Sequence, residues 1–138
     1  MPGARSALLG ALLLLPVSCV DVSGGAVEAR WDLRNENGDR IDECTKTPVA
    51  ALRFSLTPSA GGVDPCAGDP GCRFACDLKT GATGFVVPEG DYTMALEAQD
   101  SDGKVLGPPG VVPPEPVTRR VVHGRVTDLN VNLIIVTP

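Results

Sequence analysis

Aromatic residues and histidine are scarce in this chain. Phe, Trp and Tyr make up 4% of the 138 residues, and His123 is the only histidine. Once a core is filled, so few aromatic rings leave none for a platform that stacks sugars, and no G-x-S-x-G motif presents a serine to His123. We therefore expect neither a carbohydrate-binding site nor a hydrolase triad. The aromatic residues are expected in the core: Trp31, Phe54, Phe74, Phe85 and Tyr92.

Positive charge is also in short supply. Lys and Arg number 12 against 17 Asp and Glu, which gives a net charge of −5, and the basic residues form no stripe. Such a chain does not attract nucleic acid, so no nucleic-acid partner is expected. The protein is also expected not to be an enzyme. The acidic residues that alternate with apolar ones are interpreted as solvated outer-face charges rather than as a glycosidase acid and base: Glu28, Asp32, Asp91 and Glu97.

No apolar run is long enough to cross a membrane. The run from Ala7 to Leu15 has nine residues, about half of the ~20 that a spanning helix needs. Arg5 precedes this run and Cys19 follows it, an order typical of an export signal. Because Ser18 precedes Cys19, the segment resembles a bacterial lipoprotein signal, although Pro16 stands where such signals usually have an aliphatic residue.

This resemblance implies a particular processing and location. Residues 1–18 would be a signal peptide, and residues 19–26 would comprise a lipidated Cys19 and a flexible tether. The lipid would make the membrane a partner and anchor the protein to the outer membrane of the cell envelope, facing an oxidising compartment. Asp21 leaves the inner membrane open as well. The alternative is an ordinary secretory signal, cut between Ser18 and Gly25, which would give a secreted protein.

Without Cys19 the chain has an even set of cysteines. No C-x-x-C pair and no second histidine accompany them, so neither zinc nor any other cofactor is expected. In an exported protein such a set forms disulfides. Of the three pairings, which all remain open, we favour Cys66 with Cys72, because they flank a Gly-Asp-Pro-Gly turn, and hence Cys44 with Cys76. The short loop would contribute about 2–2.5 kcal/mol and the long one about 3–4 kcal/mol.

Alternation of apolar and polar residues predicts β-strands through the rest of the chain. Gly and Pro are abundant, with 16 and 13 residues, and no segment has the pattern of an amphipathic helix. We therefore predict an all-β fold, a single antiparallel β-sandwich of seven or eight strands over residues 27–138. The expected strands cover 27–34, 52–57, 72–76, 84–87, 92–98, 104–106, 117–122 and 129–136. The inward face of the last strand is expected to consist of Leu129, Val131, Leu133 and Ile135, with Asn130 and Asn132 outward.

A motif in the middle of the chain points to a more specific fold. The segment Val87-Pro88-Glu89-Gly90-Asp91-Tyr92 resembles the P-x-G-x-Y turn and strand of transthyretin-like and carboxypeptidase-regulatory-like sandwich domains. The resemblance implies an Ig-like or prealbumin-like sandwich, in which the Tyr92 ring joins the core and its hydroxyl bonds nearby backbone. It also implies a binding role without catalysis, because such domains serve as adhesins, carriers, spacers and accessory modules. The segment from Asp100 to Lys104 is interpreted as a hairpin turn rather than a calcium loop.

Two irregular segments are candidates for recognition. The loop at 59–71 contains Asp64 and Asp69 and would be made rigid by a Cys66–Cys72 bridge. The stretch at 107–116 contains Pro109 and Pro113 and is either a polyproline II ridge for a protein partner or a stiff connection between sheets. The sequence thus predicts a non-enzymatic, membrane-tethered lipoprotein that binds or spaces partners. The alternative is a secreted accessory or ligand-binding domain, and the oligomeric state is not indicated.

Overall fold

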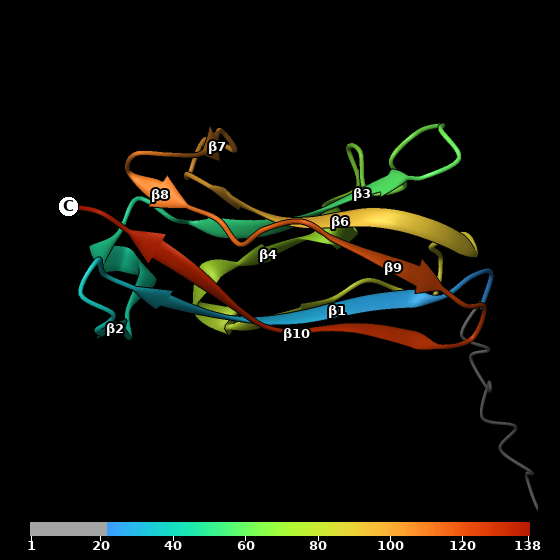
Figure 1. The fold of residues 1–138 in the computed structure, drawn as a ribbon, viewed down its shortest axis with the longest axis horizontal. Coiled ribbons are helices and arrows are strands. Elements are labelled where there is room, and N and C mark those ends of the chain that lie inside the picture. The colour runs from blue at the N-terminus through green and yellow to red at the C-terminus, as the bar shows by residue number, and fades with distance from the viewer. Residues whose placement is uncertain (1–21) are drawn as a thin grey trace, which may run out of the picture.

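The computed structural model describes residues 22–138, and in this part of the chain it consists of two β-sheets arranged as layers (Figure 1). One sheet has the strand order β2-β1-β10-β8, with β5 also paired to β1, and the other has the order β4-β3-β6-β7, with β9 also paired to β6. The expected all-β class is therefore confirmed. The strands are β1 Ala26–Arg34, β2 Arg40–Ile41, β3 Ala51–Pro58, β4 Arg73–Ala75, β5 Thr80–Ala82, β6 Gly90–Gln99, β7 Val105–Leu106, β8 Val111–Val112, β9 Val117–Val121 and β10 Val126–Val136.

Helical structure among the described residues is limited to three short 3₁₀ turns. These are η1 Cys44–Lys46, η2 Pro70–Cys72 and η3 Cys76–Leu78. None of the helices within residues 22–138 has the length and apolar character to span a bilayer.

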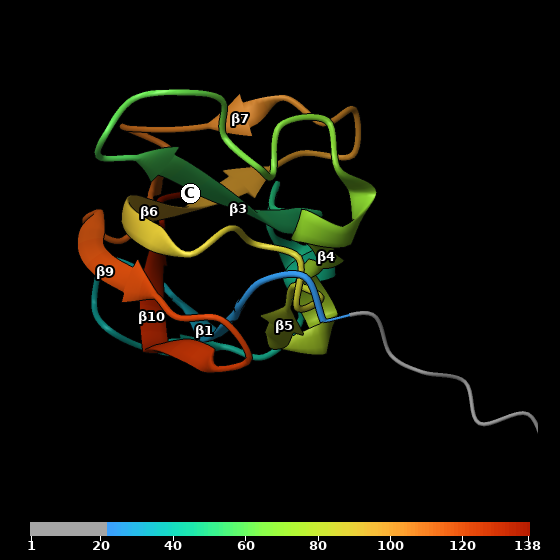
Figure 2. The same ribbon diagram turned by 90° about the vertical axis from the view of Figure 1, so that its right-hand side faces the viewer.

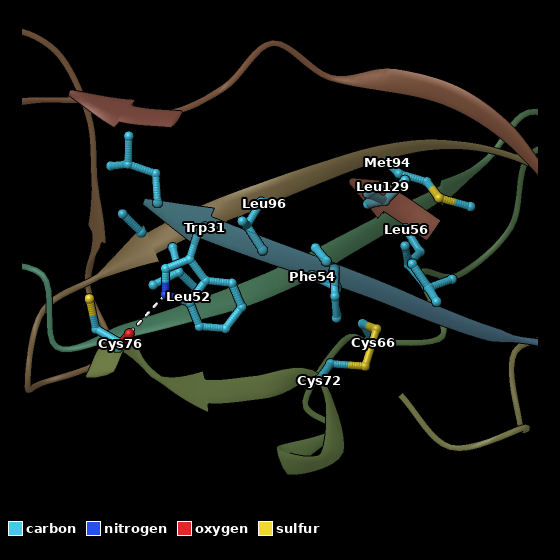
Figure 3. Packing of buried hydrophobic residues seen from close by; sticks show 14 of the residues in the cluster. Trp31, Leu52, Phe54, Leu56, Cys66, Cys72, Cys76, Met94, Leu96 and Leu129 are labelled. Atoms are coloured by element: carbon cyan, nitrogen blue, oxygen red, sulfur yellow. Dashed lines mark hydrogen bonds between the residues drawn. A yellow bond between two sulfur atoms is a disulfide. The ribbon is translucent and has the colours of Figure 1, made fainter. Parts of the chain in front are cut away.

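The hydrophobic core lies between the two layers. In β1 every second side chain points inward and is buried, as the alternation predicts, and Trp31 is 1% exposed. Inward side chains of β3 and β6, including Phe54 and Leu96, pack into the same cluster (Figure 3). Removing each large apolar side chain of this kind from water contributes about 1.5–3 kcal/mol. The core therefore joins the sheets through residues that the alternation identified.

Two disulfides border this core. Cys44 is bonded to Cys76 and Cys66 to Cys72, with S–S distances of 2.06 and 2.07 Å, so the favoured pairing is confirmed. The Trp31 indole Nε1 donates a hydrogen bond of 2.8 Å to the carbonyl oxygen of Cys76, which ties β1 to the longer disulfide loop. Two disulfide-bonded pairs fit an oxidising compartment outside the cytoplasm.

The pairing of the first and last long strands departs from the expected antiparallel sandwich. β1 and β10 run parallel over most of their lengths, whereas the other paired strands are antiparallel. Alternation shows which side chains face the core, but it does not show which strands pair or in which direction. Because β1 and β10 are far apart in the chain, no hairpin loop imposes an antiparallel direction on them.

Several short elements also differ from the expected ones. The described residues contain ten strands, including three of two residues, so the number of seven or eight is not confirmed. The strand expected at 84–87 is wrong: only Val87 forms a bridge there, and β5 lies just before it. Gly81 allows this placement, because a Cβ at Gly81 would lie 2.5 Å from the Phe74 ring. The Pro-rich connection contains β8, in which Val111 is buried.

The domain begins earlier than residue 27. The amides of Ser23 and Gly24 donate to the carbonyl of Phe85 at 3.0 and 2.8 Å, and the Gly25 amide donates to that of Val87 at 2.9 Å. Gly24 and Gly25 are buried, and a Cβ at Gly25 would lie 2.5 Å from a methyl group of Val121. Residues 23–26 of the expected tether are therefore part of the domain, while the signal segment and Cys19 lie outside the described residues.

A β-bulge at Asn130 changes which side of β10 faces the core. Glu28 pairs with Asp128 but Arg30 pairs with Val131, so the β10 strand has one extra residue there, and Asn130 has a φ of +60°. An extra residue reverses the alternation beyond it. The expected inward positions beyond Leu129 are therefore wrong. Val131 and Leu133 are 50% and 48% exposed and Ile135 is half-buried, whereas Ile134 and Val136 are buried.

Substitution of Asn130 tests this bulge. Asn130→Val should lower the free energy of unfolding by about 1–2 kcal/mol, because a β-branched residue is strained at a positive φ. Asn130→Gly should change it by less, because glycine adopts this conformation freely. Urea denaturation followed by Trp31 fluorescence measures both. Equal stability of the valine and glycine variants would contradict the left-handed conformation.

Candidate functional site

The loop between β3 and β4 is held by its own carboxylates. Asp64 Oδ1 accepts a hydrogen bond of 2.7 Å from the amide of Cys66, and Asp69 Oδ1 accepts one of 2.8 Å from the amide of Gly71 at the start of η2. Both are short-range bonds in which an Asx side chain fixes a turn. The two aspartates that the sequence marks as recognition residues thus also determine the shape of the loop.

Arg53, on the outer face of β3, connects this loop to the sheet. One guanidinium nitrogen lies 3.1 Å from Glu97 Oε2 on the opposite residue of β6, and the other donates to the Cys66 carbonyl at 3.0 Å and lies 3.7 Å from Asp64 Oδ2. The Arg53 side chain is only 19% exposed. Such a network is worth more than an isolated surface pair, because its hydrogen bonds are charge-assisted and partly shielded from water.

A hollow of about 270 Å³ opens beside this network. Among its lining residues, Arg73 Nε donates a hydrogen bond of 2.9 Å to Oε1 of Gln99, and Gln99 is almost fully buried. Within residues 22–138 Arg73 forms no ion pair, so its terminal nitrogens are available to a carboxylate or another polar acceptor. The hollow is lined by Arg53, Gly68, Asp69, Pro70, Arg73, Gln99 and Gly103.

The prolines proposed for recognition lie on the other sheet. Pro109 is exposed and Pro113 is half-buried, on either side of β8. Because β8 pairs with the end of β10, this stretch is partly integrated into the sheet and is not a free polyproline ridge throughout. The structure therefore does not combine the four residues Asp64, Asp69, Pro109 and Pro113 into one site.

The other candidate polar residues lie in turns or on the surface. His123 is exposed in the turn between β9 and β10, and Asp100 Oδ1 accepts from the amides of Asp102 and Lys104, which closes the expected hairpin turn. Asp91 pairs with Arg120 at 3.3 Å. Among the residues that the structure describes, no three His, Cys, Asp or Glu side chains gather where they could hold a metal ion.

Tyr92 occupies the position that the resemblance implies. Its ring is buried, and its hydroxyl donates a hydrogen bond of 2.6 Å to the carbonyl of Pro88, at the turn before β6. Burial raises the pKa of the Tyr92 phenol above its ordinary value, because the charged phenolate is poorly solvated there. Tyr92 therefore fastens the turn to the core as a neutral donor.

Sequence reasoning missed Arg53, Arg73 and Gln99. Arg53 and Arg73 each lie between apolar residues of a strand, and Gln99 is the last residue of β6, so none of them differs in pattern from the other polar strand residues. Their roles depend on the register of three strands, in which Arg53 lies opposite both Arg73 and Glu97. The loops that connect these strands do not reveal that register, so the sequence contains no simple signal for this network.

Comparison of the chain with models of known protein families, with curated proteins and with solved structures gave no match. Inferences about function therefore depend on the residues and their geometry.

The network around Arg53 is open to a direct test. Arg53→Gln should lower the free energy of unfolding by about 1–3 kcal/mol, because Glu97 and Asp64 lose a charged partner in a partly buried site. It should also speed amide hydrogen exchange in residues 64–72. Arg119→Gln is the matched control, because the Arg119 guanidinium is exposed and its recorded bond is to the neighbouring carbonyl of Thr118. Similar effects of the two substitutions would contradict the bracing role.

The buried phenol gives a prediction about pH. Above about pH 10 the unfolded chain releases the tyrosine proton before the folded chain does, so the free energy of unfolding should fall as the pH rises through the raised folded-state pKa. Tyr92→Phe should remove this dependence and cost about 0.5–1.5 kcal/mol at neutral pH by deleting the hydrogen bond. Phenolate absorbance reports on Tyr92 alone, because it is the only tyrosine. An unshifted titration would contradict burial of the hydroxyl.

Proposed function

We propose that the protein is a non-enzymatic cell-envelope lipoprotein, in which a β-sandwich tethered through Cys19 binds or spaces partners at the membrane surface. The observation that carries this proposal is the use of the cysteines. Two disulfides use four of the five cysteines: Cys44, Cys66, Cys72 and Cys76. The remaining cysteine is Cys19, which follows an apolar run. Lipidation explains why an exported domain has an odd number of cysteines.

The tether in this proposal is short. Three residues separate Cys19 from Ser23, the first residue with a backbone hydrogen bond to the domain. A fully extended chain covers about 14 Å over this distance, at roughly 3.5 Å per residue. The N-terminal end of β1 would therefore be held close to the membrane. This geometry suits a module that acts at the membrane surface better than one that reaches far from it.

A sandwich of the transthyretin-like or carboxypeptidase-regulatory-like kind fits this role. The bond from Tyr92 to Pro88 supports the likeness in the P-x-G-x-Y segment, and the two facing sheets support a prealbumin-like or Ig-like architecture. The hollow beside Arg73 favours binding of a polar group, because it presents guanidinium donors of β3 and β4 next to a loop made rigid by Cys66–Cys72. A loop of this kind offers a protein partner a preformed surface, which lowers the entropic cost of binding.

The second candidate function is a secreted accessory or ligand-binding domain. One observation limits it: the amides of Ser23, Gly24 and Gly25 are bonded to the domain. A signal peptidase would have to cut before Ser23 to leave these bonds in place. The expected cleavage site, between Ser18 and Gly25, is thereby narrowed to a position between Ser18 and Ser23.

Replacement of Cys19 tests the anchor. Cys19→Ala in the full chain should move the protein from the membrane fraction to the soluble fraction, because the diacyl group supplies the binding energy. Ser18→Ala is the control, since it keeps a small residue before the cysteine and should stay with the membrane. Intact-mass measurement of the wild type should show a lipid-modified N-terminal cysteine. An unmodified N-terminus in the wild type, or membrane retention of Cys19→Ala, would contradict lipidation.

A further inference from the structure

The outer face of the β1–β10 sheet has an apolar strip that nothing within residues 22–138 covers. Beyond the bulge, Val131, Leu133 and Ile135 project from β10 away from the core, and Val112 of β8 lies beside Ile135. Val131, Leu133 and Val112 are 50%, 48% and 42% exposed. An outward sheet face is ordinarily polar, and a contiguous exposed apolar patch marks an interaction surface.

A row of alternating charge runs beside this strip. The outward residues of β1 are, in order, Glu28, Arg30, Asp32 and Arg34, and the last three lie opposite Val131, Leu133 and Ile135. The order of charge is therefore minus, plus, minus, plus. Within the described residues Glu28 and Arg30 have no ion-pair partner, whereas Asp32 lies 3.5 Å from Arg40 of β2 and 4.0 Å from Arg34.

This row is complementary to itself when its direction is reversed. In two antiparallel copies centred between Arg30 and Asp32, Glu28 faces Arg34 of the second copy and Arg30 faces its Asp32. A twofold axis that crosses the strands within the contact plane produces this arrangement and also places Val131 of each copy over Leu133 of the other, because these two residues lie opposite Arg30 and Asp32. Isologous dimers require such a self-complementary surface. Sheets packed face to face cross at about 30°, which keeps the centres of the rows in register.

The charge balance of the face supports a second copy as its occupant. The whole chain carries a net charge of −5, so two copies repel each other in most orientations. Among the paired strand residues of this face, Arg30, Arg34 and Arg40 balance Glu28, Asp32 and Asp128. Asp42, just after β2, lies 3.2 Å from Arg40, so the face is close to neutral in an acidic molecule. Two molecules can approach there without net repulsion, and the apolar strip then supplies the burial.

We propose that the protein forms a twofold homodimer through the outer face of the β1–β10 sheet. Val131 and Leu133 of the two β10 strands form the dry centre of the interface, and the charge row of β1 sets the antiparallel alignment. This role does not depend on lipidation or on the hollow beside Arg73.

Sedimentation equilibrium of purified full-chain variants tests the dimer. All variants carry Cys19→Ser, so that neither a lipid nor an intermolecular disulfide at that position can join two copies. The parent should show a concentration-dependent monomer–dimer equilibrium, and Leu133→Glu should be monomeric. Val105→Glu is the matched control: Val105 is 53% exposed on β7 of the other sheet, so its substitution should leave the dimer intact.

A charge swap tests the alignment itself. Glu28→Arg alone and Arg34→Glu alone each create two like-charge contacts per dimer and should raise the dissociation constant about tenfold or more. The double variant Glu28→Arg/Arg34→Glu should return it close to the parent value. Within one chain these residues are six positions apart on a strand, about 20 Å, so a rescue must come from the second copy.

Four results would overturn the proposal. A parent that stays monomeric throughout the accessible concentration range has no such interface. A Leu133→Glu variant that is folded by Trp31 fluorescence and dimerises like the parent places the contact elsewhere. A double swap no tighter than the single swaps rules out the antiparallel alignment. Binding of a monomeric parent to phospholipid vesicles that Leu133→Glu abolishes would assign the strip to a membrane.

Discussion

The parallel pairing of β1 with β10 is the contact on which the rest of this fold depends. β1 lies within its sheet, between β5 and β10 (Figure 2). β2 pairs with the same edge of β1 as β5 does, and the Trp31 side chain of β1 is buried in the core. Because β1 is the first strand and β10 the last, every other strand lies between them in the sequence. The pair can therefore form only after the whole domain has been synthesised. Such non-local pairing slows folding. The hydrogen bond from Trp31 to the carbonyl of Cys76, which is itself bonded to Cys44, restrains β1 independently of β10.

The long strands could be predicted from the sequence because apolar residues on their inward face alternate with polar residues on their outward face. In β1, β3 and β6 apolar inward residues alternate with mostly polar outward residues over most of the length, and these strands lie close to where they were expected. β10 does not follow this rule: after Leu129 its apolar residues are Val131 and the unbroken run from Leu133 to Val136, so the phase of the strand depends on whether Asn130 occupies a bulge. Alternation does not determine that local conformation, and it does not determine strand direction either.

The candidate site was less predictable, for a reason that lies in its chemistry. Asp64 and Asp69 were predicted as recognition residues because they are charged and lie in an irregular loop. In the structure one oxygen of each accepts a hydrogen bond from the backbone amide two residues further on. No sequence pattern marks Arg53 and Arg73, although their guanidinium groups line the hollow and can donate hydrogen bonds to a ligand. The roles of these side chains are set by strand register and by a disulfide, which act between residues distant in sequence. Only the Pro88-to-Tyr92 segment, whose contacts are local, carried its structural role in the sequence itself.

The proposed anchor and the proposed dimer together constrain how the protein would sit on a membrane. The twofold axis passes at Trp31, five residues from Ala26 at the start of β1, so antiparallel β1 strands put the two copies' Ala26 ends about 33 Å apart at about 3.3 Å per residue. Each tether reaches only about 14 Å, so both lipids can enter one bilayer only if both Ser23 ends lie near its surface. That requires the twofold axis to stand along the membrane normal and the β1 strands to run parallel to the membrane. The sheets then stand on edge, and the hollow beside Arg73, on the outer face of the other sheet, points sideways along the membrane in both copies.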